Sequence, residues 1–368
     1  MNKQVYQHVF YVSEPHLAEY ANHIYHEAFK LGIIMYVAIP QEWDNLLIDV
    51  SIYHKIYIES INNHMHFENV YCNYCYKEFE SRCTNWWKIC YGLGNDNFIY
   101  AHKHKTKKLR GYLACSEYDA YKMSFICPSY VIGLAKLNVD DVYQHSFDKL
   151  IDAGYDPKKK TILFLHTWKK TKQFGDAYAK SGCSDYLETA KQLQTLTDKY
   201  NIIHKNHHNT HKEFEGFINV PNGFDSKALL KAADLTIADY GGSAIEACLT
   251  DGLLIYVDDE DNLSLTRQNL DNFVHNIFTH CVPSRVLDMV STMETFPLNS
   301  AVQDVKHSIA NFFIGNTYNP AKVFAKFMYA LDTGADLRAF KYDEKQRPET
   351  EKQIARFSQF LIGKATRK

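Results

Sequence analysis

Apolar and polar residues along the first third of the chain follow a pattern that predicts strands alternating with helices. Short β-rich apolar runs are expected as strands at Val5–Val12, Ile33–Ile39, Lys55–Glu59 and Asn97–Ala101. Apolar residues at helical spacing predict a helix over His16–Leu31, and the aromatic residues Trp86, Trp87 and Tyr91 are expected on another helix. Strands that alternate with helices predict a parallel sheet with helices on both faces.

A polar turn near residue 155 separates this region from a second and clearer series of the same kind. Its strands are expected at Thr161–His166, Asn201–Lys205, Leu235–Ala238 and Leu253–Val257, and its helices at Asp185–Tyr200, Ser226–Ala233 and Ser243–Thr250. Later in the chain the pattern predicts only helices, at Ala301–Phe313, Pro320–Leu331 and Glu349–Leu361. We therefore expect one α/β domain over residues 1–155, a second over 156–300 and terminal helices over 301–368.

Composition and charge fit two globular domains and disfavour nucleic acid as a partner. The chain has 368 residues, too many for one average domain, and is 46% hydrophobic and 23% charged. Lysine and arginine number 41 against 43 aspartate and glutamate, so no overall basic charge favours nucleic acid as a partner. An anionic ligand must instead be held by a local cluster of donors.

Cysteine usage and hydropathy favour a reducing location. The group Cys72, Cys75, Cys83 and Cys90 lacks a second close pair at zinc-ligand spacing, which favours reduced core thiols over a metal site. The first residues lack the apolar stretch of a signal peptide, and no apolar run is long enough to span a bilayer. The expected location is the cytoplasm.

Polar side chains follow two predicted strands of the second series, where doubly wound sheets bind their ligands. Thr167 and Lys169 offer a hydroxyl and a cation to a phosphate, with a solvated loop as the alternative. Four residues of His204–His211 are histidines, and Lys205 and His207 are candidates for contacts with phosphate. A zinc site there would need a helix, which this asparagine-rich segment does not favour.

The third strand end carries the most specific pattern. The predicted strand Leu235–Ala238 is followed by Asp239 and by the pair Gly241 and Gly242, which allows a tight turn. Ser243 then begins a helix, whose free backbone N–H groups suit a pyrophosphate. Glu246, one turn later, can accept hydrogen bonds from ribose hydroxyls. A plain turn is the alternative interpretation.

The second domain resembles the CDP-glycerol glycerophosphotransferase family in these three segments. The family's Pro-Thr-Trp-Arg corresponds to His166–Lys169, and its basic-x-His-Pro corresponds to Lys205–His208. Its Ala-Asp-x-x-Ile-x-Asp-Tyr-Ser-Ser corresponds to Ala233–Gly242, with Glu246 at the family's glutamate position.

The chain also departs from the family pattern. His166 and His208 replace prolines, and a glycine pair replaces the two serines. In the first domain, His102–Arg110 corresponds to the family's His-Gly-Thr-Pro-Leu-Lys-Lys-Leu-Gly, with Lys103 in place of its first glycine. The similarity is therefore strongest over the second domain.

This resemblance implies a fold and a reaction. The fold is α/β and GT-B-like, with two Rossmann-like βα domains that face a cleft, followed by C-terminal helices. The implied enzyme moves a glycerol-phosphate, polyol-phosphate or sugar group from a CDP- or UDP-linked donor to a hydroxyl of a polymer or lipid-linked acceptor. Such a transferase serves teichoic acid, capsule or lipopolysaccharide synthesis. It uses no resident cofactor, and no bound metal is expected.

The resemblance also implies roles for individual residues. The implied donor-binding residues are Thr167, Lys169, Lys205, Asp239, Gly241, Gly242, Ser243 and Glu246. His102 is the implied general base for the acceptor hydroxyl, because imidazole accepts protons near neutral pH. The sequence does not decide between His102 and His104, and a solvated basic loop is the alternative for both. His207 would stabilise charge on the leaving phosphate.

Two other functions fit the same residues. The Gly-Gly-Ser turn also resembles UDP-sugar 2-epimerases, so an epimerase or hydrolase is one alternative. A non-catalytic nucleotide-binding assembly protein is the other. The basic residues of Lys103–Arg110 favour contact with an anionic polymer or with lipid headgroups at the inner face of the membrane, or they form a solvated loop.

Overall fold

A computed structural model gives the structure for residues 3–47, 53–73, 77–90, 108–137, 140–166, 186–206, 212–221, 223–239, 242–257, 279–295, 300–315 and 319–365. Its strands form two sheets, ordered β3-β2-β1-β4-β5-β6-β7 and β10-β9-β8-β11-β12-β13. Every strand pair within the two sheets is parallel, as predicted. The predicted α/β fold class is therefore confirmed.

The first sheet draws on the N-terminal part of the chain and the second on the part after residue 160. Strands of the first sheet are β1 Gln4–Tyr11, β2 Met35–Ile39, β3 His54–Tyr57, β4 Met65–Cys72, β5 Cys83–Ile89, β6 Leu109–Ala114 and β7 Ser129–Val131. Strands of the second are β8 Thr161–Leu165, β9 Asn201–Lys205, β10 Ile218–Val220, β11 Leu235–Ala238, β12 Leu253–Val257 and β13 Thr279–Cys281.

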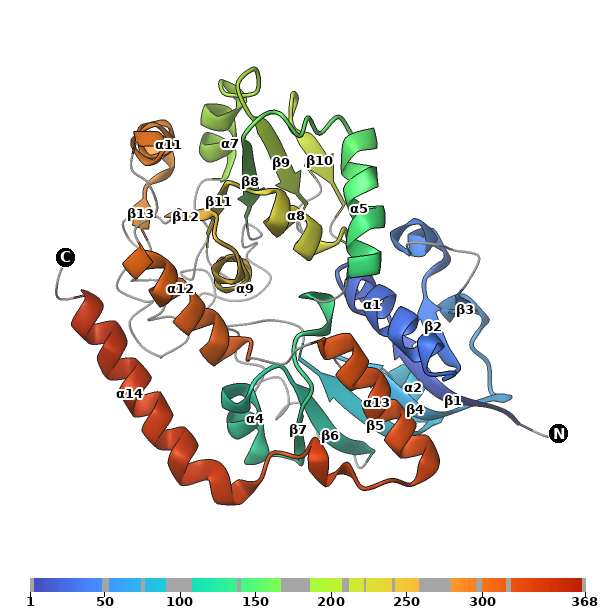
Figure 1. Cartoon of the computed structure of the whole chain (residues 1–368). Helices are drawn as coiled ribbons and strands as arrows, with labels where there is room; N and C mark the ends of the chain where they lie inside the picture. The colour runs from blue at the N-terminus through green and yellow to red at the C-terminus, as the bar shows by residue number, and fades with distance from the viewer. Residues whose placement is uncertain are drawn as a thin grey trace.

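Helices cover the sheets and connect them (Figure 1). In the first half they are α1 Leu17–Lys30, α2 Lys77–Glu80, α4 Glu117–Ser124 and α5 Asp140–Asp152, with short 3-10 helices that include η1 Gln41–Leu46 and η3 Ala135–Leu137. In the second half they are α7 Tyr186–Gln194, α8 Ser226–Ala232, α9 Gly242–Glu246, η5 Ala247–Leu249, α11 Val286–Thr295, α12 Ser300–Phe313, α13 Pro320–Thr333 and α14 Arg347–Ala365.

The C-terminal helices return the chain to the first domain. Helix α12 packs beside α9 and η5, α13 packs on α1, and α14 lies along α4 (Figure 1). Local signals set the ends of α13: the Asn319 side chain accepts a hydrogen bond from the Lys322 N–H at 2.8 Å, Pro320 follows it, and Gly334 ends the helix at φ +65°. None of the helices in the described ranges has the length and apolar character needed to cross a bilayer.

Two sequence predictions need correction. Trp86 and Trp87 lie on strand β5, where adjacent side chains point to opposite faces and each tryptophan joins a different apolar cluster. A strand buried on both faces shows no alternation, so its sequence cannot be told from a helix by periodicity. The predicted helix Ser243–Thr250 is split into α9 and η5. Tyr91 and the predicted strand Asn97–Ala101 lie outside the described residues.

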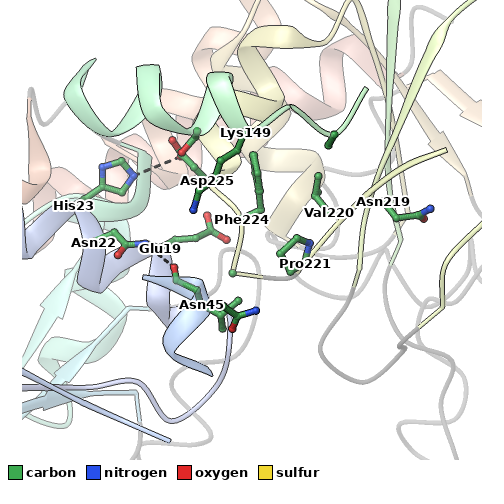
Figure 2. Close-up of a pocket in the computed structure, with 14 residues that line it drawn as sticks. Glu19, Asn22, His23, Asn45, Lys149, Asn219, Val220, Pro221, Phe224 and Asp225 are labelled. Carbon is green, nitrogen blue, oxygen red and sulfur yellow. Dashed lines mark hydrogen bonds and ion pairs between the residues drawn. The ribbon is translucent and has the colours of Figure 1, made fainter. Parts of the chain in front are cut away.

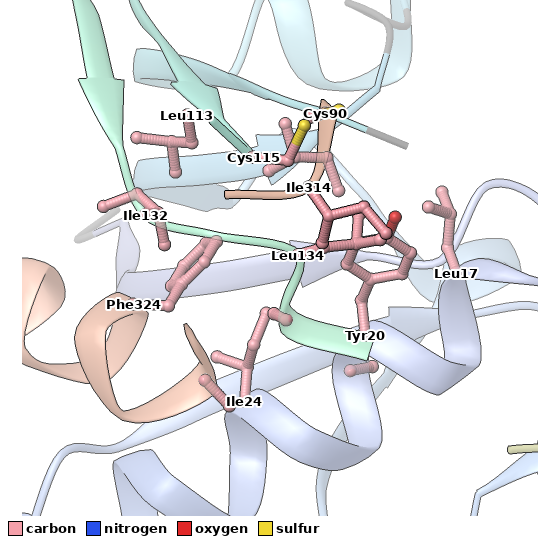
Figure 3. Packing of buried hydrophobic residues seen from close by; sticks show 14 of the residues in the cluster. Leu17, Tyr20, Ile24, Cys90, Leu113, Cys115, Ile132, Leu134, Ile314 and Phe324 are labelled. Carbon is pink, nitrogen blue, oxygen red and sulfur yellow. The ribbon is translucent and has the colours of Figure 1, made fainter. Parts of the chain in front are cut away.

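One apolar cluster fixes the position of η3 against α1. Figure 3 shows Tyr20 and Ile24 of α1 beside Leu134, with Phe324 of α13 close by. Each of these side chains is at most 3% exposed. Leu134 and the following Ala135 are buried in this core. The next residue, Lys136, is therefore held at a defined place between the two sheets.

Candidate functional site

The strand order of the second sheet reverses between β8 and β11, and ligands of doubly wound sheets bind beyond such a point. His166 follows β8 and Asp239 follows β11, and they are 5% and 4% exposed. Gly242 and Ser243 begin the next helix and are partly exposed. The residues that were predicted to bind the donor, and that the structure describes, therefore lie at one edge of the sheet. The short α9 offers free N–H groups there but little macrodipole.

Glu246 lies on the inner side of this edge and forms an ion pair with Lys136 of η3. The Lys136 Nζ and Glu246 Oε1 atoms are 2.7 Å apart, and the two side chains are 11% and 8% exposed. Burial by itself would lower the pKa of Lys136, but the Glu246 and Glu19 carboxylates raise it above the ordinary value. The ammonium group therefore stays charged between two carboxylates.

Lys205, at the end of β9, forms a second buried ion pair. Its Nζ contacts Oε1 of Glu19 on α1 and donates to Ser226 Oγ at 2.8 Å. The other Glu19 oxygen accepts from the Ser226 N–H at 3.0 Å. Burial lowers the pKa of Lys205, the Glu19 carboxylate opposes this, and Lys136 adds to the lowering. A first-domain carboxylate thus neutralises a cation that the sequence assigns to donor binding.

His204 forms a buried hydrogen-bonded pair with His166 below this edge. Asn219 donates through its Nδ2 to the Phe214 and Phe217 carbonyls, so its Oδ1 must accept the hydrogen bond from His204 Nδ1, at 3.1 Å. The Nε2 atom of His204 then accepts from His166 Nε2, at 3.0 Å. Burial and the neighbouring His166 lower the pKa of His204 to about 3. His204 is therefore a neutral core residue rather than a phosphate-binding cation.

A pocket of about 250 Å³ lies between the two domains beside the Glu19 and Lys205 pair. Residues of α1, η1, α5 and the loop between β10 and α8 line it. Figure 2 shows His23 of α1 directed towards Asp225 at the start of α8, with 3.5 Å between His23 Nε2 and Asp225 Oδ1. A Cβ atom added at Gly223 would lie 2.9 Å from the Pro15 carbonyl oxygen, so the two domains pack closely here.

The first sheet has its own reversal point, between β1 and β4, and a polar cluster lies beyond it. Ser13 donates to Asn73 Oδ1 at 2.9 Å, and Asn73 donates to Glu14 Oε1 at 3.4 Å. Lys88 donates to the Asn73 carbonyl at 2.6 Å. Burial raises the pKa of Glu14, against the Asn73 hydrogen bond, and burial lowers the pKa of Lys88 to about 8. Groups with shifted pKa values at such a position are candidates for proton transfer.

Several site predictions cannot be placed. His102, Thr167, Lys169, His207 and Gly241 all lie outside the described residues. The described predictions are Lys205, Asp239, Gly242, Ser243 and Glu246, which lie at the carboxyl edge of the second sheet.

Two residues of the site, Glu19 and Lys136, were missed from the sequence. Glu19, His23 and Glu27 recur at four-residue spacing on α1 and are all at most 4% exposed. This buried polar stripe could have indicated a charged partner facing α1. Nothing local marks Lys136, which follows an apolar stretch.

One group of possible metal ligands occurs within the described ranges. It consists of Cys90, Cys115 and Asp119, all buried. Asp119 Oδ2 already accepts hydrogen bonds from the Tyr112 hydroxyl at 2.8 Å and from the Cys115 N–H at 3.2 Å. Burial raises the pKa of Cys115, so its thiol stays protonated and favours packing over ligation.

Comparisons with known proteins support the fold. No family model and no curated protein sequence matches the chain. A variant of the wall teichoic acid polymerase TagF, soaked with CDPG, matches with a TM-score of 0.61 and 12% identity over 89% of each chain. A UDP-N-acetylglucosamine 2-epimerase matches with a TM-score of 0.52 and 11% identity over 91% of this chain and 97% of that one.

A third solved structure, that of S. aureus MnaA with UDP, matches with a TM-score of 0.51 and 12% identity over 91% of this chain and 98% of that one. The likeness extends over nearly the whole length of each protein. At such low identity it shows the fold alone. The GT-B-like arrangement of two α/β domains with C-terminal helices is confirmed.

Proposed function

We propose that this protein is a GT-B-type transferase that binds a CDP- or UDP-linked donor at the carboxyl edge of its second sheet. The observation that carries the proposal is the placement of Asp239, Ser243 and Glu246 just beyond the strand-order reversal, where Glu246 is paired with Lys136 of the first domain. The fold likeness to TagF soaked with CDPG and to MnaA with UDP supports a nucleotide ligand.

The proposed donor contacts follow from the chemistry of this edge. Glu246 accepts hydrogen bonds from the ribose, and the backbone N–H groups of Gly242 and Ser243 face the pyrophosphate. Glu19 neutralises Lys205, so Lys205 alone attracts phosphate weakly. Thr167 and His207 are the further phosphate contacts that the sequence predicts.

The proposed reaction is a displacement at the donor. An acceptor hydroxyl attacks the phosphorus or carbon atom next to the nucleotide, and the bond from that atom to the departing phosphate oxygen breaks. The acceptor proton goes to a base of the first domain, and the nucleotide leaves with the electron pair. His102 is the base that the family resemblance implies. Glu14 is a second candidate, because it lies at the reversal point of the first sheet and its pKa is raised.

The acceptor is proposed to be polymeric or lipid-linked. The basic residues of Lys103–Arg110 would meet its anionic groups or the inner face of the membrane. The proposed location is the cytoplasm. The proposed site has no resident cofactor or metal, because cations and backbone N–H groups take the place of magnesium at the phosphates.

An epimerase or hydrolase of UDP-sugars is the second candidate, favoured by the match to a UDP-N-acetylglucosamine 2-epimerase. A thermal-shift panel of CDP-glycerol, CDP-ribitol, UDP-sugars and CMP-sugars, run in EDTA, tests both. Stabilisation by a CDP- or UDP-linked donor, followed by transfer to an added acceptor, is the expected result. Conversion of a UDP-sugar without an acceptor would favour the epimerase, and no stabilisation by any of them would refute nucleotide binding.

A further inference from the structure

We propose that Lys136 is a positioning residue that holds Glu246 ready to accept hydrogen bonds from the donor ribose. This inference rests on the proposed function and extends it to a residue outside the second sheet. Lys136 belongs to η3, which follows β7 of the first sheet and packs on α1. Glu246 belongs to α9 of the second domain.

Among the described residues, the contacts of Glu246 leave one of its carboxylate oxygens for a ligand. Oε1 of Glu246 is bound by the Lys136 ammonium at 2.7 Å. No residue within the described ranges donates a hydrogen bond to Oε2. A carboxylate oxygen that is fixed and ionised is a strong acceptor for a hydroxyl. The pair therefore presents a charged acceptor at the predicted ribose position.

The electrostatics require Lys136 for this task. A glutamate that is only 6% exposed pays a large desolvation cost in its ionised form unless a cation compensates it. Lys136 supplies that cation and stays protonated, since its pKa is raised by Glu246 and Glu19. Without Lys136, Glu246 would lose the cation that compensates its charge and holds its carboxylate in place.

The placement of Lys136 depends on the first domain. The core that holds Leu134 against Tyr20 and Ile24 (Figure 3) continues into η3 and sets the direction of the lysine. Glu19, on the same helix α1, acts on Lys136 from the first-domain side. The ribose position is therefore complete only while the two domains are packed together, which couples donor binding to domain packing.

The test compares two nucleotides in two lysine variants and a control. Affinities for CDP and for 2′,3′-dideoxy-CDP are measured by calorimetry, with the uridine pair used if the parent prefers UDP. Lys136→Met should lower the affinity for CDP by at least about tenfold. It should lower the affinity for the dideoxy nucleotide by less than about twofold. Lys136→Arg keeps the charge and should restore most of the CDP affinity.

Lys306→Met is the matched control, because Lys306 is also a buried lysine, 3% exposed, but donates to the Thr250 and Gly252 carbonyls. It should leave the ratio of the two affinities unchanged. Glu246→Gln should remove the same ribose-dependent part of the affinity, and adding Lys136→Met to it should remove little more.

Equal weakening of both nucleotides by Lys136→Met would reduce Lys136 to a structural role and overturn the inference, as would unchanged CDP binding. If Lys136→Met does not fold, Lys136→Gln takes its place, and full additivity of Lys136→Gln and Glu246→Gln overturns the inference instead. A parent protein that binds neither nucleotide fails the proposed function itself. That result differs from a parent that binds CDP and a Lys136→Met variant that weakens both nucleotides equally.

Discussion

Replacing His204 by glutamine should remove a specific part of the protein's acid sensitivity. The pKa of His204 is lowered from 6.5 to about 3 in the folded chain. Between these values the unfolded chain binds a proton that the folded chain does not, so stability falls as the pH falls below 6.5. Between about pH 7.5 and about pH 5.5, this one group should cost about 1.4 kcal/mol of unfolding free energy.

The measurement is urea unfolding followed by circular dichroism at both pH values. The difference between parent and His204→Gln isolates the pair that His204 forms with His166, since the other histidines are common to both proteins. Glutamine keeps an amide that can contact Asn219. His64→Gln, at an exposed histidine, controls for the loss of a histidine as such. The same loss of stability in parent and His204→Gln would refute a neutral His204 in the folded chain.

Three further predictions concern the contacts between the domains and the chemistry. Glu19→Gln should destabilise the fold by about 3 to 5 kcal/mol, because it leaves the Lys205 charge buried. Adding Lys205→Met should recover part of this, and full additivity in urea unfolding would contradict the ion pair. Glu14→Gln should lower turnover, while its donor affinity stays within about twofold of the parent's. An unchanged turnover would exclude Glu14 as the base. His207→Ala should lose far more turnover than donor affinity, and an unchanged turnover number removes it from the mechanism.

Much of the second domain could be predicted because its signals are local. Strands β9, β11 and β12 have the predicted bounds, since each is a short apolar run with a turn on either side. Asp225 caps α8 by accepting from the Lys227 N–H at 3.0 Å. The edge strands β10 and β13 have three residues each, too few to show a period. They were missed for that reason.

The partners of the site could not be predicted, because they are far apart in the sequence. Glu19 and Lys205 come from different domains, and only the packing of α1 over the end of β9 brings them together. The same holds for Lys136 and Glu246. Strand ends indicate where a ligand site lies, whereas the charge that compensates each site residue depends on how two domains meet.

Calorimetric titration of CDP and UDP in EDTA, with the parent and Gly242→Val, tests the central claim most directly. A β-branched side chain at this partly exposed position would occupy the space proposed for the phosphates. The parent should bind at least one nucleotide without metal, folded Gly242→Val should bind neither, and Ser243→Ala should lose about 1 to 3 kcal/mol. A folded Gly242→Val protein that binds as tightly as the parent would contradict the donor site.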